Sequence, residues 1–96
     1  MSESAEQLVF RVHAVQRMVE RGISAADVRQ VLATGETIED YPQDTPFPSR
    51  LVLGWRQSRP IHVVFADNRQ EREIIVVPVY EPDPTLWDAD FRRRQR

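Results

Sequence analysis

Hydrophobic residues near the start of the chain recur at helical spacing. Wound at about 100° per residue, the stretch from His13 to Ser24 separates into an apolar arc and a polar arc. This pattern predicts a helix from His13 to Arg21, and Gly22 ends it because glycine readily takes the left-handed conformation of a C-terminal cap. We expect the apolar arc to be the core face, with Val12 at its edge; its members are Ala14, Val15, Met18 and Val19.

A second helix is predicted directly after the first. Ser24 and Asp27 are three residues apart, which resembles the spacing of a capping box, and Gly35 is a stop signal. The buried stripe of this helix is predicted to consist of Val28, Val31 and Leu32. The short connection predicts that the two helices pack together as an αα-hairpin. A DNA-binding helix-turn-helix is disfavoured, because the second helix presents only Arg29 and Gln30 to a groove and the chain is acidic.

The remainder of the chain alternates apolar and polar residues in short runs, which is typical of strands joined by turns. Residues 42–48 hold three of the seven prolines and are predicted to form a loop. Turns are expected at 57–60 and 67–72. The predicted strands form an antiparallel meander and cover residues 36–41, 49–56, 61–65 and 73–80.

Three further segments complete the prediction. Leu8–Val12 is either a short strand or the lead into the first helix, and its five residues do not decide between the two. Pro78 cannot donate to a strand ladder, so that end of the last strand should lie at an edge or a bulge. Asp83, as N-cap, begins a short C-terminal helix, which Trp87 and Phe91 should hold against the sheet.

The expected fold is therefore α+β: an N-terminal helical hairpin packed on a four-stranded, mainly antiparallel sheet, with a short C-terminal helix. Ninety-six residues suffice for one core, so we expect a single domain over 1–96 with residues 1–7 disordered.

Composition and charge narrow the function classes. The chain has no cysteine, which excludes disulfides and thiolate metal sites, and we expect neither a bound metal nor a cofactor. No apolar run approaches the length of a membrane span and the start does not resemble a signal peptide, so a cytoplasmic protein without a membrane partner is expected. A formal net charge of −2 argues against a large nonspecific nucleic-acid footprint, although all thirteen basic residues are arginine, the better bidentate phosphate ligand.

The polar arc of the first helix carries the most suggestive chemistry. His13, Arg17, Glu20 and Arg21 stack along it at i, i+4, i+7 and i+8. An imidazole, two guanidiniums and a carboxylate suit either a solvated ion-pair network or a phosphate-handling site. The sequence leaves both interpretations open.

Residues outside this helix are weaker candidates. Tyr80, in the last strand, is either a core residue or a proton donor, and His62 is either a half-exposed strand residue or a second imidazole of the site. Arg92 and Arg93 belong to a basic run near the C-terminus, which is either a solvated charge run or a contact for RNA.

Several motifs together resemble a known family. They are the run His-Ala-x-x-Arg-Met-x-Glu-Arg-Gly-Ile-Ser from His13, Gly-Glu ahead of Tyr-Pro, Pro-Ile-His-Val-Val from Pro60, and Val-Tyr-Glu-Pro-Asp-Pro-x-x-Trp ending at Trp87. This combination is similar to the DUF4258 group of small bacterial and archaeal proteins over about residues 13–93. In that family the last strand usually ends Ile-Ile-Thr-Val-Tyr, whereas here Pro78 replaces the hydroxyl residue and Tyr80 is kept.

Members of that group resemble RelE and MqsR toxins, and their genes often lie beside zinc-finger antitoxins of the MqsA kind. The resemblance implies a RelE-like fold and metal-independent cleavage of messenger RNA. In such chemistry His13, Arg17, Glu20, Arg21 and Tyr80 would be the catalytic candidates, and His62, Arg92 and Arg93 would bind substrate. The alternative is a non-enzymatic module on the same fold that binds a protein or RNA. The sequence does not predict the oligomeric state.

Overall fold

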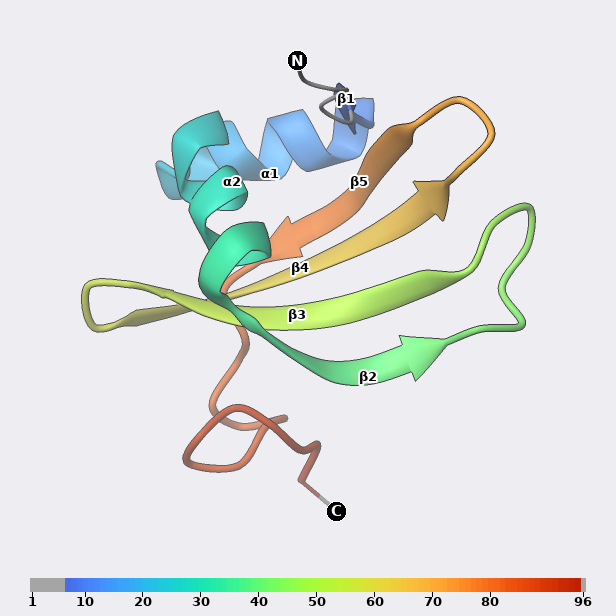
Figure 1. Cartoon of the computed structure of the whole chain (residues 1–96). Coiled ribbons are helices and arrows are strands. Elements are labelled where there is room, and N and C mark those ends of the chain that lie inside the picture. Colours follow the sequence, from blue (N-terminus) through green and yellow to red (C-terminus); the bar gives the residue numbers. More distant parts are fainter. Residues whose placement is uncertain (1–6, 96) are drawn as a thin grey trace.

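The computed structural model describes residues 7–95 and contains a five-stranded mixed sheet with two helices on one face (Figure 1). The strand order is β1-β5-β4-β3-β2. The strands are β1 (Gln7–Phe10), β2 (Glu36–Tyr41), β3 (Ser49–Arg56), β4 (Arg59–Asn68) and β5 (Glu73–Tyr80).

Strands β2 to β5 form the predicted antiparallel meander, and β1 adds a strand that the four-stranded prediction lacked. β1 pairs parallel to β5, with Gln7 opposite Glu73 and Phe10 opposite Val76. Of the two alternatives for Leu8–Val12, a short strand or the lead into the first helix, the structure shows a strand, which ends at Phe10. Gln7 belongs to it, so the predicted disorder is wrong at that position; the rest of that predicted segment, residues 1–6, lies outside the described part of the chain.

The end of α1 and the start of α2 have the caps that the sequence predicts. α1 (Val12–Arg21) ends at Gly22, which has φ 67° and ψ 31° and donates to the carbonyls of the last turn. α2 (Ala25–Thr34) begins with the capping box: the Ser24 hydroxyl accepts from the Asp27 N–H at 3.0 Å, and the Asp27 carboxylate accepts from the Ser24 N–H at 2.9 Å. That backbone hydrogen bond from Ser24 lowers the pKa of the Asp27 carboxyl.

The helices pack on the sheet, not principally on each other. α1 lies against β5, and α2 lies against β3 and β4. Gly54 permits the close approach of α2, because a Cβ at this position would be 2.7 Å from the side chain of Val31. The predicted αα-hairpin packing is therefore wrong, since each helix buries its own apolar stripe on the sheet.

Only a narrow stripe of α1 is buried. Ala14 and Met18 reach the core, whereas Val12, Val15 and Val19 are 69, 44 and 76% exposed. The prediction of a core face that included Val15 and Val19 was therefore wrong. Helix α1 lies over the β5 side of the sheet without a second helix packed along its flank, so its wider apolar arc faces solvent. The shared core also contains Ile23, Val28, Val31, Val52, Ile61, Val63, Val76 and Val79.

Residues 81–95, here called the terminal segment, cover part of the face of the sheet opposite the helices (Figure 1). Asp83 accepts from the N–H and hydroxyl of Thr85, as an N-cap should, but no helix follows. The chain turns back, so that Trp87 pairs with Arg94 in an isolated bridge. Asp88 and Asp90 accept from backbone N–H groups of Arg93 and Arg92, and this local bonding competes with helical bonding.

The expected fold class is thus corrected in three respects. The sheet has five strands, not four, and it is mixed because β1 is parallel to its neighbour. A strand, not the helical pair, begins the described chain. The C-terminal helix is replaced by an irregular segment, although Trp87 does anchor it, being only 2% exposed. Among residues 7–95, neither helix has the length and apolar character that crossing a bilayer demands.

Candidate functional site

Arg17 and Arg21 of α1 line a pocket beside the last residues of β5. This edge pocket has a volume of about 270 Å³ and is lined by Arg17, Arg21, Pro78, Val79, Tyr80 and Glu81. The i, i+4 spacing puts the two guanidiniums on one side of the helix, next to the strand on which the helix packs. Two arginines and a tyrosine predicted from separate parts of the sequence therefore share one small hollow.

The pocket exists because β5 extends beyond its neighbour β1. The parallel pairing ends at Val76, whose carbonyl accepts from the Arg11 N–H at 3.0 Å. The chain then enters α1 and leaves the rest of β5 without a strand partner on that side among the described residues. Pro78 lies in this part and within the register shift between β4 and β5, so its prediction at an edge or bulge is confirmed.

Two arginines of the β3–β4 hairpin hold the end of α1 beside the pocket. Arg59 donates to the Arg21 carbonyl at 3.1 Å, and Arg56 donates to the Gly22 carbonyl at 2.5 Å. Carbonyls at the C-terminus of a helix have no hydrogen-bond donor within the helix, and these two arginines supply one. Their positive charges also interact favourably with the negative end of the helix dipole. Arg59 also pairs with Glu81 at 2.5 Å, which raises the pKa of its guanidinium. The last turn of α1 and the end of β5 are therefore tied to the same side chain.

Tyr80 connects the pocket to a buried histidine on the other face of the sheet. Its hydroxyl lies 3.2 Å from Nδ1 of His62, and Nε2 of His62 lies 2.9 Å from the Phe91 carbonyl. A carbonyl only accepts, so Nε2 carries the hydrogen and Nδ1 accepts from the Tyr80 hydroxyl. Trp87 packs edge-on against the imidazole with ring centroids 4.4 Å apart.

Burial keeps this pair uncharged near neutral pH. His62 is fully buried, and desolvation lowers the pKa of its imidazole even though the Phe91 carbonyl raises it. Desolvation likewise raises the pKa of the Tyr80 hydroxyl, with Arg94 opposing it. At rest the pair is therefore a neutral hydrogen bond from the Tyr80 hydroxyl to His62, and a proton moves along it only as the Tyr80 oxygen gains another.

The structure assembles only part of the predicted site. His13 and Glu20 are exposed and do not line the edge pocket, although His13 is one helical turn before Arg17. His62 is sealed beneath the terminal segment and faces away from the helices, so the expectation of a half-exposed residue was wrong. Arg92 pairs with Glu36 at 2.9 Å, and neither it nor the exposed Arg93 lines the edge pocket.

Sequence reasoning missed Glu81 and Arg59. Glu81 follows the last strand directly and so had a positional signal, because residues at strand ends often line pockets. Arg59 had none, since its partners Arg21 and Glu81 are distant in the sequence and meet it only through the β3–β4 hairpin. Across residues 7–95, no three His, Cys, Asp or Glu side chains gather in a group able to hold a metal ion.

Comparison with known proteins gives a family without an activity. The sequence model of a family described as a domain of unknown function (DUF4258) matches residues 10–81. That range contains strands β2 to β5, both helices and the whole edge pocket, and it ends where the terminal segment begins; of β1 it contains only Phe10. No curated protein and no solved structure matches the chain.

Proposed function

Because the chain belongs to the DUF4258 family, whose function is unknown, we propose its activity from the edge pocket: it is a ribonuclease that binds an RNA phosphate between Arg17 and Arg21. The observation that carries this proposal is that both guanidiniums line one pocket with Tyr80. Guanidiniums bind phosphate oxygens bidentately and stabilise the negative charge that develops as phosphorus is attacked.

In the proposed reaction the ribose 2′-hydroxyl attacks the adjacent phosphorus and the bond to the 5′ oxygen breaks, giving a 2′,3′-cyclic phosphate and a 5′-hydroxyl. Tyr80 takes the 2′-hydroxyl proton while its own proton passes to Nδ1 of His62. The Phe91 carbonyl holds the opposite N–H and stabilises the imidazolium. Solvent water gives a proton to the leaving 5′ oxygen. His13 and Glu20 have no part in this scheme, because neither lines the edge pocket.

The experiment incubates the purified chain with end-labelled single-stranded RNA in the presence of a chelator and analyses the product ends. We expect products ending in a 2′,3′-cyclic phosphate. Replacing Arg17 or Arg21 with alanine should lower the cleavage rate about 10²-fold, as the loss of a donor to a transition-state charge does elsewhere. Tyr80→Phe should abolish cleavage but leave RNA affinity unchanged. Arg29→Ala, which removes an exposed arginine on α2, is the matched control.

A non-enzymatic RNA-binding module is the second candidate. Two observations favour it. His62 is buried under the terminal segment and so has no contact with solvent, and the Tyr80 hydroxyl already forms a hydrogen bond with His62. RNA binding that depends on Arg17 and Arg21 without any cleavage would identify this second function. Absence of both binding and cleavage would refute the phosphate site itself.

The proposal also includes a partner and a location. An antitoxin of the zinc-finger type, as the family resemblance implies, would silence the chain by placing acidic side chains against Arg17 and Arg21. Cleavage of messenger RNA would place the protein in the cytoplasm. Co-expression with an antitoxin of this type should then relieve a growth arrest that the wild-type chain causes, and Arg17→Ala alone should relieve it equally.

A further inference from the structure

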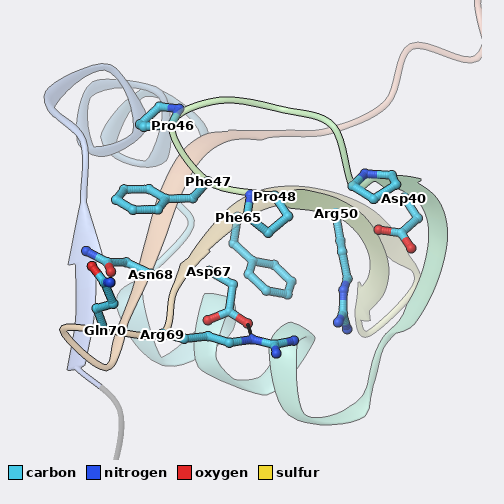
Figure 2. Close-up of a pocket in the computed structure, with 11 residues that line it drawn as sticks. Asp40, Pro46, Phe47, Pro48, Arg50, Phe65, Asp67, Asn68, Arg69 and Gln70 are labelled. Atoms are coloured by element: carbon cyan, nitrogen blue, oxygen red, sulfur yellow. Dashed lines mark hydrogen bonds and ion pairs between the residues drawn. The ribbon is translucent and has the colours of Figure 1, made fainter.

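A second and larger pocket lies where the β2–β3 loop meets the β4–β5 turn (Figure 2). Its volume is about 600 Å³, within the range of small-molecule sites. We call it the phenylalanine pocket, because Phe47 and Phe65 line it together with Arg50, Asp67, Asn68 and Arg69. None of these residues lines the edge pocket, so the inference below does not rest on the proposed ribonuclease.

Strand register brings an aromatic ring, a cation and a carboxylate to one face of the sheet. Arg50 and Phe65 are direct cross-strand partners on β3 and β4, and Asp67 is two residues beyond Phe65. Side chains two apart on a strand share a face. Figure 2 accordingly shows the Phe65 ring between Arg50 and Asp67, with Phe47 contributed by the loop. Both phenylalanines are half-buried, so part of each ring is available to a ligand.

The charged groups of this pocket are poorly satisfied within the chain. Oδ1 of Asp67 is buried and accepts no hydrogen bond from any described residue. Oδ2 has only a 3.4 Å contact with Arg69, whose side chain is 79% exposed, so this pair contributes little. No acidic group within residues 7–95 forms an ion pair with Arg50. A buried carboxylate oxygen without a donor is costly, and a ligand that supplies donors would recover that free energy.

We propose that the phenylalanine pocket binds guanine, either as a mononucleotide or as a base of single-stranded RNA. The Watson–Crick edge of guanine presents two parallel N–H donors, which match the two oxygens of one carboxylate. Rotation about the broad terminal torsion of Asp67 brings both oxygens toward them. Phe65 and Phe47 supply the apolar surface on which a base stacks, and Arg50 binds the phosphate.

The same arrangement rejects adenine. Adenine places a ring nitrogen acceptor beside its amino donor, so one carboxylate oxygen would face a lone pair. A site built for hydrogen bonds discriminates strongly against an analogue that leaves its polar groups unpaired. We therefore expect at least a tenfold preference for guanosine monophosphate over adenosine monophosphate.

Calorimetric titration of the full chain with both nucleotides tests this expectation. Asp67→Asn should weaken guanosine monophosphate binding at least tenfold and leave adenosine monophosphate unaffected. Arg50→Gln should weaken guanosine monophosphate about tenfold but leave guanosine, which has no phosphate, unchanged. Arg29→Gln is the control for loss of a positive charge elsewhere on the chain. Arg17→Ala should bind guanosine monophosphate as the wild-type chain does, whether or not it retains ribonuclease activity.

Two further titrations use the Arg17→Ala chain, in which the edge pocket is weakened, and short RNAs with a single guanine or with adenine in its place. Tighter binding of the guanine RNA than of the mononucleotide identifies RNA as the source of the base, and equal affinity identifies the mononucleotide. Equal affinity of the wild-type chain for the guanine and adenine nucleotides would overturn the proposal. That comparison needs no variant, so it holds even if Asp67→Asn fails to fold; where it folds, unchanged guanine binding would overturn the proposal equally.

Discussion

The two faces of the sheet are covered in chemically different ways. Ile61 and His62 are consecutive in β4 and both are fully buried, yet they point to opposite faces. Ile61 joins the aliphatic core beneath the helices. His62 lies under the terminal segment, where its two nitrogens bond Tyr80 and Phe91 and its ring meets Trp87.

This difference shows that one strand can serve two kinds of packing. Beneath the helices, stability comes from filled apolar volume without ionisable groups, so pH has little effect on it. Beneath the terminal segment, stability also depends on a neutral imidazole, which responds to pH, and on ion pairs at the border, which salt screens. The family match ends at residue 81, so the pH-sensitive covering lies outside the matched range.

Substitution of Ile61 should have the largest effect. Ile61→Ala removes buried methyl groups from the aliphatic face and leaves a cavity, which costs about 2–5 kcal/mol of unfolding free energy. Urea denaturation followed by circular dichroism measures it. Val19→Ala is the control, because Val19 is 76% exposed and its replacement should change stability by less than about 0.5 kcal/mol. A loss below 1 kcal/mol for Ile61→Ala would refute the filled-volume account of this face.

Acidification should selectively weaken the opposite face. Burial lowers the pKa of His62 below its ordinary value near 6.5, so the unfolded chain binds the proton more readily. The stabilising contribution of the neutral imidazole is fully present above pH 6.5 and is lost as pH falls through the pKa of the folded state.

The unfolding free energy should therefore fall below pH 6.5, by at most about 1.4 kcal/mol per pH unit for this one group. Urea midpoints between pH 7.5 and 5.5 measure the slope. His62→Gln should flatten it, because glutamine keeps a polar side chain but does not titrate. Equal slopes in the wild-type chain and in His62→Gln would contradict the assignment.

The smallest effect is expected at the border of the terminal segment. Arg92 and Glu36 are 44 and 52% exposed, and water screens their 2.9 Å pair. Arg92→Ala should cost less than about 1 kcal/mol, and most of the cost should vanish in 1 M salt. Arg93→Ala, for which the structure gives no ion pair, should cost less still. A larger loss for Arg92→Ala that persists at high salt would show that the segment is held more firmly at its border than beneath Trp87.

Local signals predicted the local structure well. The capping box at Ser24 and Asp27, the left-handed Gly22 and the bulge at Pro78 all depend on neighbouring residues, and each is confirmed. The antiparallel order of β2 to β5 also followed from short turns, because adjacent strands in a meander must pair.

The errors concern contacts between distant residues. The pairing of β1 with β5 and the separate packing of the two helices depend on which distant surfaces meet, and hydrophobic spacing does not specify that. The terminal helix failed because Asp88 and Asp90 bond nearby N–H groups while Trp87 is drawn against His62.

For the candidate site, helical spacing correctly grouped Arg17 with Arg21, and the two share a pocket with Tyr80. The same spacing placed His13 and Glu20 on that arc of the helix. The edge pocket contacts only part of the arc, and neither residue lines it. Glu81 joins the site only through the end of β5, and Arg59 reaches it through the opposite hairpin. Neither position has helical periodicity to reveal it.

The parallel pairing of β1 with β5 has a consequence for synthesis on the ribosome. Gln7 is synthesised well before its partner Glu73, because both helices and strands β2 to β4 lie between them in the sequence. The antiparallel hairpins can form during synthesis, because their strands are adjacent in the sequence. Strand β1, in contrast, has no pairing partner until β5 has been synthesised. Newly made chains that stop short of β5 would therefore expose Leu8 and Phe10, a mark by which quality-control proteases can distinguish truncated products from finished ones.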